Sequence, residues 1–245
     1  MSPHRPPVIK DGDAIEFGIT TEAEFRIPYT FAEALNEGTL CDRQPGSFER
    51  AAHEQRLFQV VNAANQNMIA TAMIQDYARG ADGTHHEGQF GGIIVHPSAR
   101  GFGIASLLSK IVMVHEFGAN RYDAGEEEYV AHVMDGNKGP IHALVHAGFR
   151  PEGYIHVHLD DFSGSMGHMV EEGESDIVMH RYVFDPTALD GLIFDLWKFQ
   201  TEDGGVIQNH HDGVRVAVDF ADVVDPAYVE AHVDYLKEQD RLPNR

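Results

Sequence analysis

Short apolar blocks separated by polar turns run through the middle of the chain and predict a mixture of strands and helices. Residues 56–78 contain two apolar, β-prone runs on either side of the polar stretch NAANQN, which predicts a β-hairpin. Residues 90–97, FGGIIVHP, are apolar without strict alternation, as is typical of a buried central strand. Over 104–117 the apolar positions recur at helical spacing, which predicts a long helix that ends at the Gly-Ala-Asn of 118–120.

Shorter elements are predicted on both sides of this central unit. Upstream we expect a helix over 20–38 that breaks near Ile27, ahead of Pro28, and a loop over 41–48. Downstream the pattern predicts, in order, a strand over 128–137, a short helix over 139–149, strands over 154–160, 176–184 and 213–220, and a helix over 226–241. This order of elements indicates a mixed α/β fold.

A break near Asp185 and Pro186 is the one domain boundary that the composition suggests. We expect residues 1–14, with three prolines and no apolar period, to form a flexible tail. Residues 15–185 would form the main domain, and residues 186–245 a C-terminal extension. The extension could pack on the main domain or complete a homodimer, and the sequence does not choose.

The chain is strongly acidic, because 39 Asp and Glu residues against 18 Lys and Arg residues give a formal net charge of −21. Such a surface repels nucleic acid and anionic lipid, so we exclude both as main partners. Solubility, for example in a salty habitat, would explain the acidity. An acidic cleft for a cationic amine would explain it as well, and any phosphate site must be a local exception.

Cysteine content and hydropathy narrow the chemistry and the location. Cys41 is the single cysteine, so an internal disulfide, a CxxC pair and a thiolate zinc site are ruled out. No apolar stretch approaches the roughly 18 residues of a membrane span. Residues 1–17 lack the basic start and apolar run of a signal peptide, and we therefore expect a cytoplasmic protein.

The apolar run of 90–97 leads through the turn SARGFG into the long helix, and this arrangement suits an anion. The first N–H groups of a helix have no partner within it and lie at the positive end of its dipole. Gly101 and Gly103 let a phosphate approach the backbone, and Arg100 and Ser106 could add side-chain donors. The backbone donors would be those of Phe102, Gly103, Ile104 and Ala105. We interpret the turn as a pyrophosphate site, although it matches neither the Rossmann nor the Walker pattern.

Two motifs resemble those of the GCN5-related N-acetyltransferase (GNAT) superfamily. The stretch VHPSARGFGIASLLSK resembles motif A, in which Q/R-x-x-G-x-G/A follows a strand ending in V-x-P; Arg100, Gly103 and Ala105 fill its fixed positions. The stretch DGNKGPIHALVHAGF resembles motif B, an asparagine (Asn137) followed by a short helix that closes in Gly-Phe. The resemblance covers residues 15–185 and implies the GNAT fold: a mixed, mostly antiparallel sheet with a splayed central strand and flanking helices. A C-terminal α/β appendage would be added to it here.

The resemblance also implies a donor site. In that family the motif A turn binds the pyrophosphate of an acyl-coenzyme A, and the central strand offers backbone groups to the pantetheine arm. The residues implied here are Ile93, Ile94, Val95, Arg100, Gly101, Phe102, Gly103, Ile104, Ala105, Ser106 and Asn137. The co-substrate would be acetyl-CoA or another acyl-CoA, and no metal is required. His142 and His146 could chelate a metal with His156 and His158, although no carboxylate pattern accompanies them.

The usual catalytic groups of the family are absent from this sequence. The tyrosine expected in the motif B helix is replaced by Leu144, and the carboxylate expected on the central strand by Gly91 or Gly92. Acid–base catalysis would need substitutes. The candidates are Glu87, His132 and, as an alternative acid, Tyr154.

The resemblance implies direct transfer of an acetyl group from acetyl-CoA to a primary amine of a small acceptor. The acidic composition favours a cationic acceptor such as a polyamine, an aminoglycoside or an amino-acid side chain. Two alternatives stay open. Gly91 and Gly92 could make room for a succinyl or longer acyl group, as in an arginine succinyltransferase-like reaction. The missing acid and base would also suit a non-catalytic acyl-CoA-binding sensor.

Overall fold

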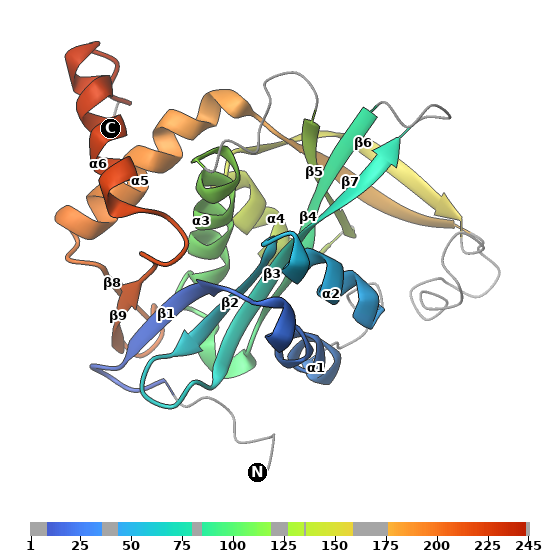
Figure 1. Ribbon diagram of the computed structural model, residues 1–245, viewed down its shortest axis with the longest axis horizontal. Helices are drawn as coiled ribbons and strands as arrows, with labels where there is room; N and C mark the ends of the chain where they lie inside the picture. The colour runs from blue at the N-terminus through green and yellow to red at the C-terminus, as the bar shows by residue number, and fades with distance from the viewer. Residues whose placement is uncertain are drawn as a thin grey trace.

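The structure, a computed structural model, describes residues 9–35, 44–79, 85–118, 127–134, 136–158 and 176–243. Within them one sheet has the strand order β6-β7-β5-β4-β3-β2-β1-β9-β8 (Figure 1). The strands are β1 (Ala14–Ile19), β2 (Leu57–Asn62), β3 (Met68–Arg79), β4 (His85–Val95), β5 (Glu127–Met134), β6 (Phe149–His158), β7 (Asp176–Phe184), β8 (Val206–Gln208) and β9 (Arg215–Asp219). The helices are α1 (Arg26–Leu35), α2 (Pro45–His53), α3 (Ile104–Gly118), α4 (Lys138–His146), α5 (Leu189–Thr201) and α6 (Pro226–Glu238). Short 3₁₀ turns are η1 (Glu22–Glu24), η2 (Pro97–Ala99) and η5 (Pro186–Ala188).

The sheet is mixed but mostly antiparallel. The parallel pairs are β4 with β5 and β1 with β9, while the remaining neighbours run antiparallel. The predicted hairpin is formed by β2 and β3, and the predicted central strand is β4. The expected mixed, mostly antiparallel α/β architecture is therefore confirmed.

The two central strands separate partway along their length. β4 and β5 are paired only from His86–Glu127 to Gln89–Val130, although β4 continues to Val95 and β5 to Met134. Opposite β3, the register of β4 shifts at a bulge where Gly92 has a φ of +62°. A bulge bends its strand, and a positive φ favours glycine, so Gly92 is placed where the strands diverge. The splayed central strand expected from the sequence is confirmed.

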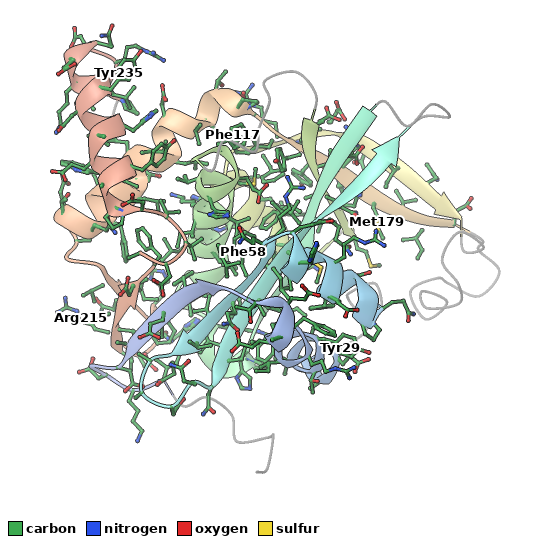
Figure 2. All side chains as sticks on the ribbon, viewed as in Figure 1. Tyr29, Phe58, Phe117, Met179, Arg215 and Tyr235 are labelled. Atoms are coloured by element: carbon green, nitrogen blue, oxygen red, sulfur yellow. The ribbon has the colours of Figure 1, made fainter. Side chains whose placement is uncertain are left out.

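Helices cover both faces of the sheet and build two hydrophobic cores. The smaller core lies under α1 and α2, where Phe25 and Phe48 pack with Leu57, Met73 and Ile94 of the sheet. The larger core contains the buried faces of α3, α4, α5 and α6. Figure 2 shows the crowding of side chains in the interior, where Phe58 and Phe117 lie, whereas Tyr235 projects from the outside of α6.

A buried ion pair links three elements of the larger core. Arg56, just before β2, donates from Nε to Oε2 of Glu116 on α3 at 3.0 Å, and Glu116 is 0% exposed. Tyr129 of β5 donates from Oη to the same carboxylate oxygen at 3.1 Å. A charge that is removed from water in this way needs such partners, so the three side chains act as one unit.

The N-terminal third departs from the sequence expectations in two places. The break predicted near Ile27 lies two residues earlier, at Phe25, between η1 and α1. Pro28 is tolerated because it lies in the first turn of α1, where no intrahelical donor is needed. The loop expected over 41–48 is wrong for residues 45–48, because α2 begins at Pro45 and buries Phe48. Residues 41–43 lie outside the described residues.

The C-terminal segment is continuous with the sheet. β9 pairs in parallel with β1, from Ala14–Ala217 to Glu16–Asp219, and β8 forms the edge beyond it. The turn before β1 is joined to it as well, since the Gly12 N–H donates to the Arg215 carbonyl at 2.9 Å. Residues 1–8 of the expected tail lie outside the described residues. In the part of the chain that the structure describes, no helix is both long and apolar enough to cross a membrane.

Candidate functional site

The glycine turn has the geometry of an anion cradle. His96 caps η2, with its Nδ1 accepting the Ser98 N–H at 3.2 Å, and α3 begins eight residues later at Ile104. Gly101 and Gly103 have φ values of +91° and +76°. A Cβ at Gly103 would meet nothing within 4 Å, so that side of the turn is not crowded by other side chains. The free N–H groups at the start of a helix are donors that commonly bind phosphate groups in proteins.

The other predicted donor residues of the turn are divided between core and surface. Phe102 and Ile104 are buried, 4% and 1% exposed, so they can offer a ligand only their backbone N–H groups. The Arg100 side chain is exposed, and Ser106 is half-buried one turn into α3. Side-chain and backbone donors are therefore available on the open side of the turn.

The C-terminal segment braces this turn, a feature that the sequence analysis missed. Asn209 donates from Nδ2 to the Arg100 carbonyl at 3.3 Å, and the His210 N–H donates to the Gly101 carbonyl at 3.2 Å. A Cβ at Gly101 would lie 2.9 Å from Cδ2 of His211. No local motif marks these contacts, because they join segments more than 100 residues apart in the sequence.

The splay leaves one edge of β4 unpaired beside the turn. Ile94 and Val95 are registered with Thr71 and Ala70 of β3, whereas among the described residues the edge toward β5 has no strand partner beyond Gln89. Ile93 lies in the same stretch, directly after the bulge glycine. These are the residues expected to bind pantetheine, and the structure places their backbone along the gap between β4 and β5.

Polar side chains gather at the point where β4 and β5 begin to separate, the vertex of the splay, on the face of the sheet that α1 and α2 cover. Tyr129, Ala131 and Val133 of β5 enter the larger core, so His132 points to the opposite face. Gln89 of β4 contacts it there, with 2.8 Å between Gln89 Nε2 and His132 Nδ1. An amide nitrogen can only donate, so Nδ1 accepts and the proton of the neutral ring lies on Nε2.

Glu87 lies beside this pair and is held by an arginine of β7. Glu87 is 5% exposed, and its Oε2 is 3.6 Å from Nη2 of Arg181. Arg181 also forms ion pairs with Glu128 of β5 and Glu152 of β6, whose side chains are about half exposed. Arg181 is the registered partner of His132, so Glu87 and His132 are brought together.

Tyr154 lies elsewhere. It is registered with His180 of β7, whose neighbour Tyr182 enters the larger core two residues on. Alternation therefore places His180 and Tyr154 on the face opposite Glu87 and His132. The Tyr154 ring is 64% exposed and lies 4.5 Å from that of His180. Among the three candidates, the structure assembles two and separates Tyr154 from them.

The motif B region supplies a backbone turn and a buried leucine. Asn137 occupies the N-cap position of α4, and its side chain makes no capping hydrogen bond. Leu144, at the position of the family tyrosine, is 1% exposed in the larger core. The rings of His142 and His146 lie 4.2 Å apart, but the described residues contain no group of three or more side chains placed to hold a metal ion.

Comparison with known proteins gives matches at the level of fold. No protein-family model matches the sequence, and no curated protein matches it. An N-acetyltransferase from Staphylococcus aureus Mu50 is similar, with 14% identity, a TM-score of 0.47, and coverage of 70% of this chain and 97% of that one. A GNAT-family acetyltransferase from Bordetella pertussis has 17% identity and a TM-score of 0.47, covering 69% and 94%. A spermidine N-acetyltransferase chimera from Vibrio cholerae and hSSAT has 16% identity and a TM-score of 0.47, covering 71% and 97%. All three structures carry the name of an acetyltransferase, and one of them is described as a member of the GNAT family.

Proposed function

We propose that the protein is an acyl-CoA-dependent N-acyltransferase of the GNAT type, which transfers an acetyl group to a primary amine. One observation carries the proposal: the splayed strand β4 leads directly into an open glycine turn at the start of α3. A pantetheine arm needs an unpaired strand edge, and a pyrophosphate needs clustered N–H donors. Here the two lie end to end, in a chain whose overall charge would otherwise repel an anion.

The roles of the donor-site residues follow from their positions. Ile93, Ile94 and Val95 would pair with the amide groups of pantetheine through their backbone. The N–H groups from Phe102 to Ala105 would bind the pyrophosphate. Arg100 and Ser106 would add side-chain donors, and Asn137 would contact the arm from the β5 side.

Acyl transfer requires that the amine lose a proton and the leaving thiolate gain one. A C–N bond forms as the C–S bond breaks. In the proposed mechanism Glu87 receives the amine proton through a water molecule, since it is too buried to reach the acceptor directly. His132 donates a hydrogen bond from Nε2 to the leaving sulfur and stays neutral, while the thiolate takes its proton from water. Gln89 holds the ring in that tautomer.

The same face favours a cationic acceptor. Arg181 is one positive charge among three carboxylates, those of Glu87, Glu128 and Glu152. Glu128 and Glu152 are half exposed, so the excess negative charge is accessible from solvent. An ammonium group approaching the splay vertex would be attracted by it.

Calorimetric binding of acetyl-CoA and a thiol-release assay against a panel of polyamines, aminoglycosides and amino acids test the proposal together. We expect binding, with turnover of at least one amine. His132→Ala and Glu87→Gln should each lower kcat by about a hundredfold while donor affinity is retained. Tyr154→Phe is the matched control and should keep wild-type kcat, because Tyr154 lies on the other face.

The alternative is a binding protein without catalysis, which the burial of Leu144 at the usual acid position favours. Tight acetyl-CoA binding with no turnover on any amine would establish that alternative. No binding at all would remove both. Competition by succinyl-CoA tests the alternative of a longer acyl donor. The glycine at position 92 supports that alternative less strongly, because its positive φ already explains why a glycine is needed there.

A further inference from the structure

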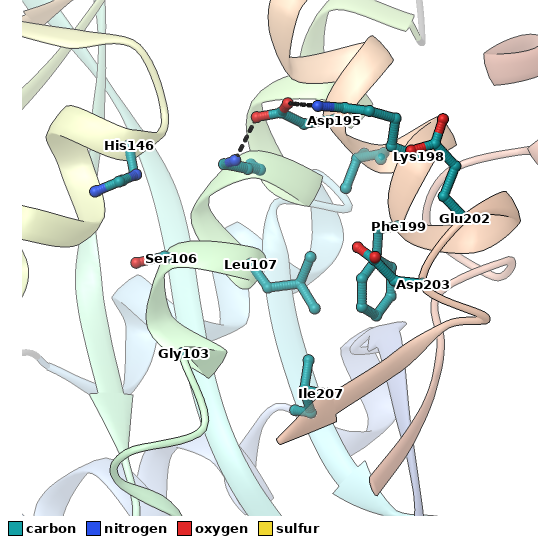
Figure 3. A pocket seen from close by; sticks show the side chains of 12 residues that line it. Gly103, Ser106, Leu107, His146, Asp195, Lys198, Phe199, Glu202, Asp203 and Ile207 are labelled. Atoms are coloured by element: carbon teal, nitrogen blue, oxygen red, sulfur yellow. Dashed lines mark hydrogen bonds and ion pairs between the residues drawn. The ribbon is translucent and has the colours of Figure 1, made fainter. Parts of the chain in front are cut away.

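A groove of about 440 Å³ lies between the first turns of α3 and helix α5 (Figure 3). Gly103 and Ser106 line its end beside the glycine turn. Leu107 of α3, Phe199 of α5 and Ile207 of β8 form an apolar part, where Figure 3 shows the Phe199 ring between the helices and the strand. The C-terminal segment therefore supplies one wall of a groove that begins at the proposed pyrophosphate site.

Two lysines line the groove, and both are paired with the same aspartate. Lys110 Nζ lies 2.6 Å from Oδ2 of Asp195, and Lys198 Nζ lies 3.4 Å from Oδ1 of the same carboxylate. One carboxylate thus compensates only one of two positive charges. Glu202 and Asp203 also line the groove, but both are exposed, so water screens their charge at the rim.

The groove has the reach that a nucleotide needs. Lys110 follows Gly103 by seven residues on α3, which is about 10 Å along the helix axis. An anionic group bound at the N-terminus of α3 would therefore lie beside an apolar surface, with Lys110 two helical turns further along α3 and Lys198 facing it from α5. This sequence of surfaces matches a diphosphate followed by a purine nucleoside that carries a further phosphate.

We infer that residues 189–211 form the outer wall of the donor site and that the nucleotide end of the acyl-CoA binds in this groove. The inference rests on the proposed function. Phe199 stacks on the adenine, and Lys110 and Lys198 bind the 3′-phosphate. The loop Asn209–His211 hydrogen-bonds to the glycine turn and so fixes the position of the groove wall relative to the proposed pyrophosphate site.

Replacement of Asp195 is an informative test, because it should increase the affinity for CoA and not decrease it. The aspartate competes with the phosphate for both ammonium groups, so Asp195→Asn should tighten CoA binding severalfold. Lys198→Gln and Lys110→Gln should each weaken it by about tenfold. A substitution that merely loosened α5 would weaken binding in every case.

Calorimetry with CoA and with dephospho-CoA, which lacks the 3′-phosphate, separates the contributions. The lysine variants should lose affinity for CoA and change little toward dephospho-CoA, whereas Phe199→Leu should weaken both ligands alike. Lys237→Gln is the matched control, since this lysine lies over Trp197 from α6 and outside the groove, and it should leave both affinities unchanged. In turnover assays Lys110→Gln, Lys198→Gln and Phe199→Leu should raise the KM for acetyl-CoA, Asp195→Asn should lower it, and the effect on kcat should be small by comparison.

Each outcome bears on one of the two proposals. If the wild-type protein binds neither CoA nor dephospho-CoA, the proposed function fails. If it binds both and the lysine variants bind CoA as well as the wild type, the nucleotide lies elsewhere and this inference is overturned. Equal loss toward both ligands in the lysine variants would overturn it too, because the 3′-phosphate would then have no part in their effect.

Discussion

Replacement of Gly101 and Gly103 by alanine, one at a time, measures how tightly the C-terminal loop is fitted to the glycine turn. Both glycines have positive φ, at +91° and +76°. Alanine in the left-handed region costs about 1–2 kcal/mol at either position. At Gly103 nothing lies within 4 Å of the new Cβ, so no further cost is expected.

At Gly101 the new Cβ would lie 2.9 Å from His211 Cδ2 and 3.1 Å from Asn209 Oδ1. One of these groups must move, and forced repacking of this kind adds about 1–3 kcal/mol. We therefore expect Gly101→Ala to lower the free energy of unfolding by about 2–5 kcal/mol and Gly103→Ala by about 1–2 kcal/mol. For a chain of this size, Tm should fall by about 10 °C and about 4 °C, respectively.

Urea unfolding of the unliganded protein is the appropriate assay, because donor binding then plays no part. The double variant Gly101→Ala/His211→Ala removes the ring that the new methyl group meets. It should regain most of the difference between the two glycine variants, while His211→Ala alone should change stability little, since His211 is exposed. Equal stability of the two glycine variants, or no recovery in the double variant, would refute the reasoning.

Three further predictions follow from groups described above. Arg56→Met should lower the free energy of unfolding, measured in urea, by about 3–5 kcal/mol, because it leaves the Glu116 charge buried without its cation. The double variant Arg56→Met/Glu116→Leu should regain most of this loss. A loss below about 1 kcal/mol in the single variant would count against the importance of the ion pair. Burial, with a smaller contribution from nearby Arg100, lowers the pKa of His96 below its ordinary value of 6.5. Just below pH 6.5 the unfolded chain therefore binds more protons than the folded protein. The contribution of His96 to stability is complete above that pH and is lost as pH falls through the lowered pKa. The free energy of unfolding should therefore differ less between pH 5.5 and pH 7.5 for His96→Asn than for the wild type. Gln89→Leu should lower kcat, and adding it to His132→Ala should bring no further loss, whereas independent losses would show that Gln89 does not act through His132.

Local patterns predicted the central part of this molecule well. The hairpin of β2 and β3, the strand β4, the glycine turn and the helix α3 are each specified by residues that lie next to one another in the sequence. Periodicity and turn chemistry are properties of such short windows, so they can be recognised without knowing the fold. The splay was expected from the family resemblance, and the register of β4 against β5 confirmed it.

Features that depend on distant partners could not be predicted in the same way. α2 was missed because its helical period is short and Pro45 suggested a loop, whereas packing of Phe48 under the sheet decides the matter. The groove and the brace on Gly101 depend on which surface of the sheet the C-terminal segment covers. The position of Tyr154 could not be predicted either, because spacing in the sequence does not reveal the face of a strand on which a residue lies once a bulge has shifted the register, as it does near Gly153.

The parallel pair of β1 and β9 fixes an order of events during synthesis. β1 can pair with β2 as soon as the hairpin region has emerged, but its other edge is completed by residues about 200 positions later. Until Arg215–Asp219 have left the ribosome, β1 is an exposed strand edge open to pairing with other chains. Residues 215–219 therefore cover the second edge of β1, and a nascent chain that has not yet reached them carries the aggregation risk of an unfinished sheet. Because residues 209 and 210 hydrogen-bond to the glycine turn, that turn also acquires its final support only after this later segment has been synthesised.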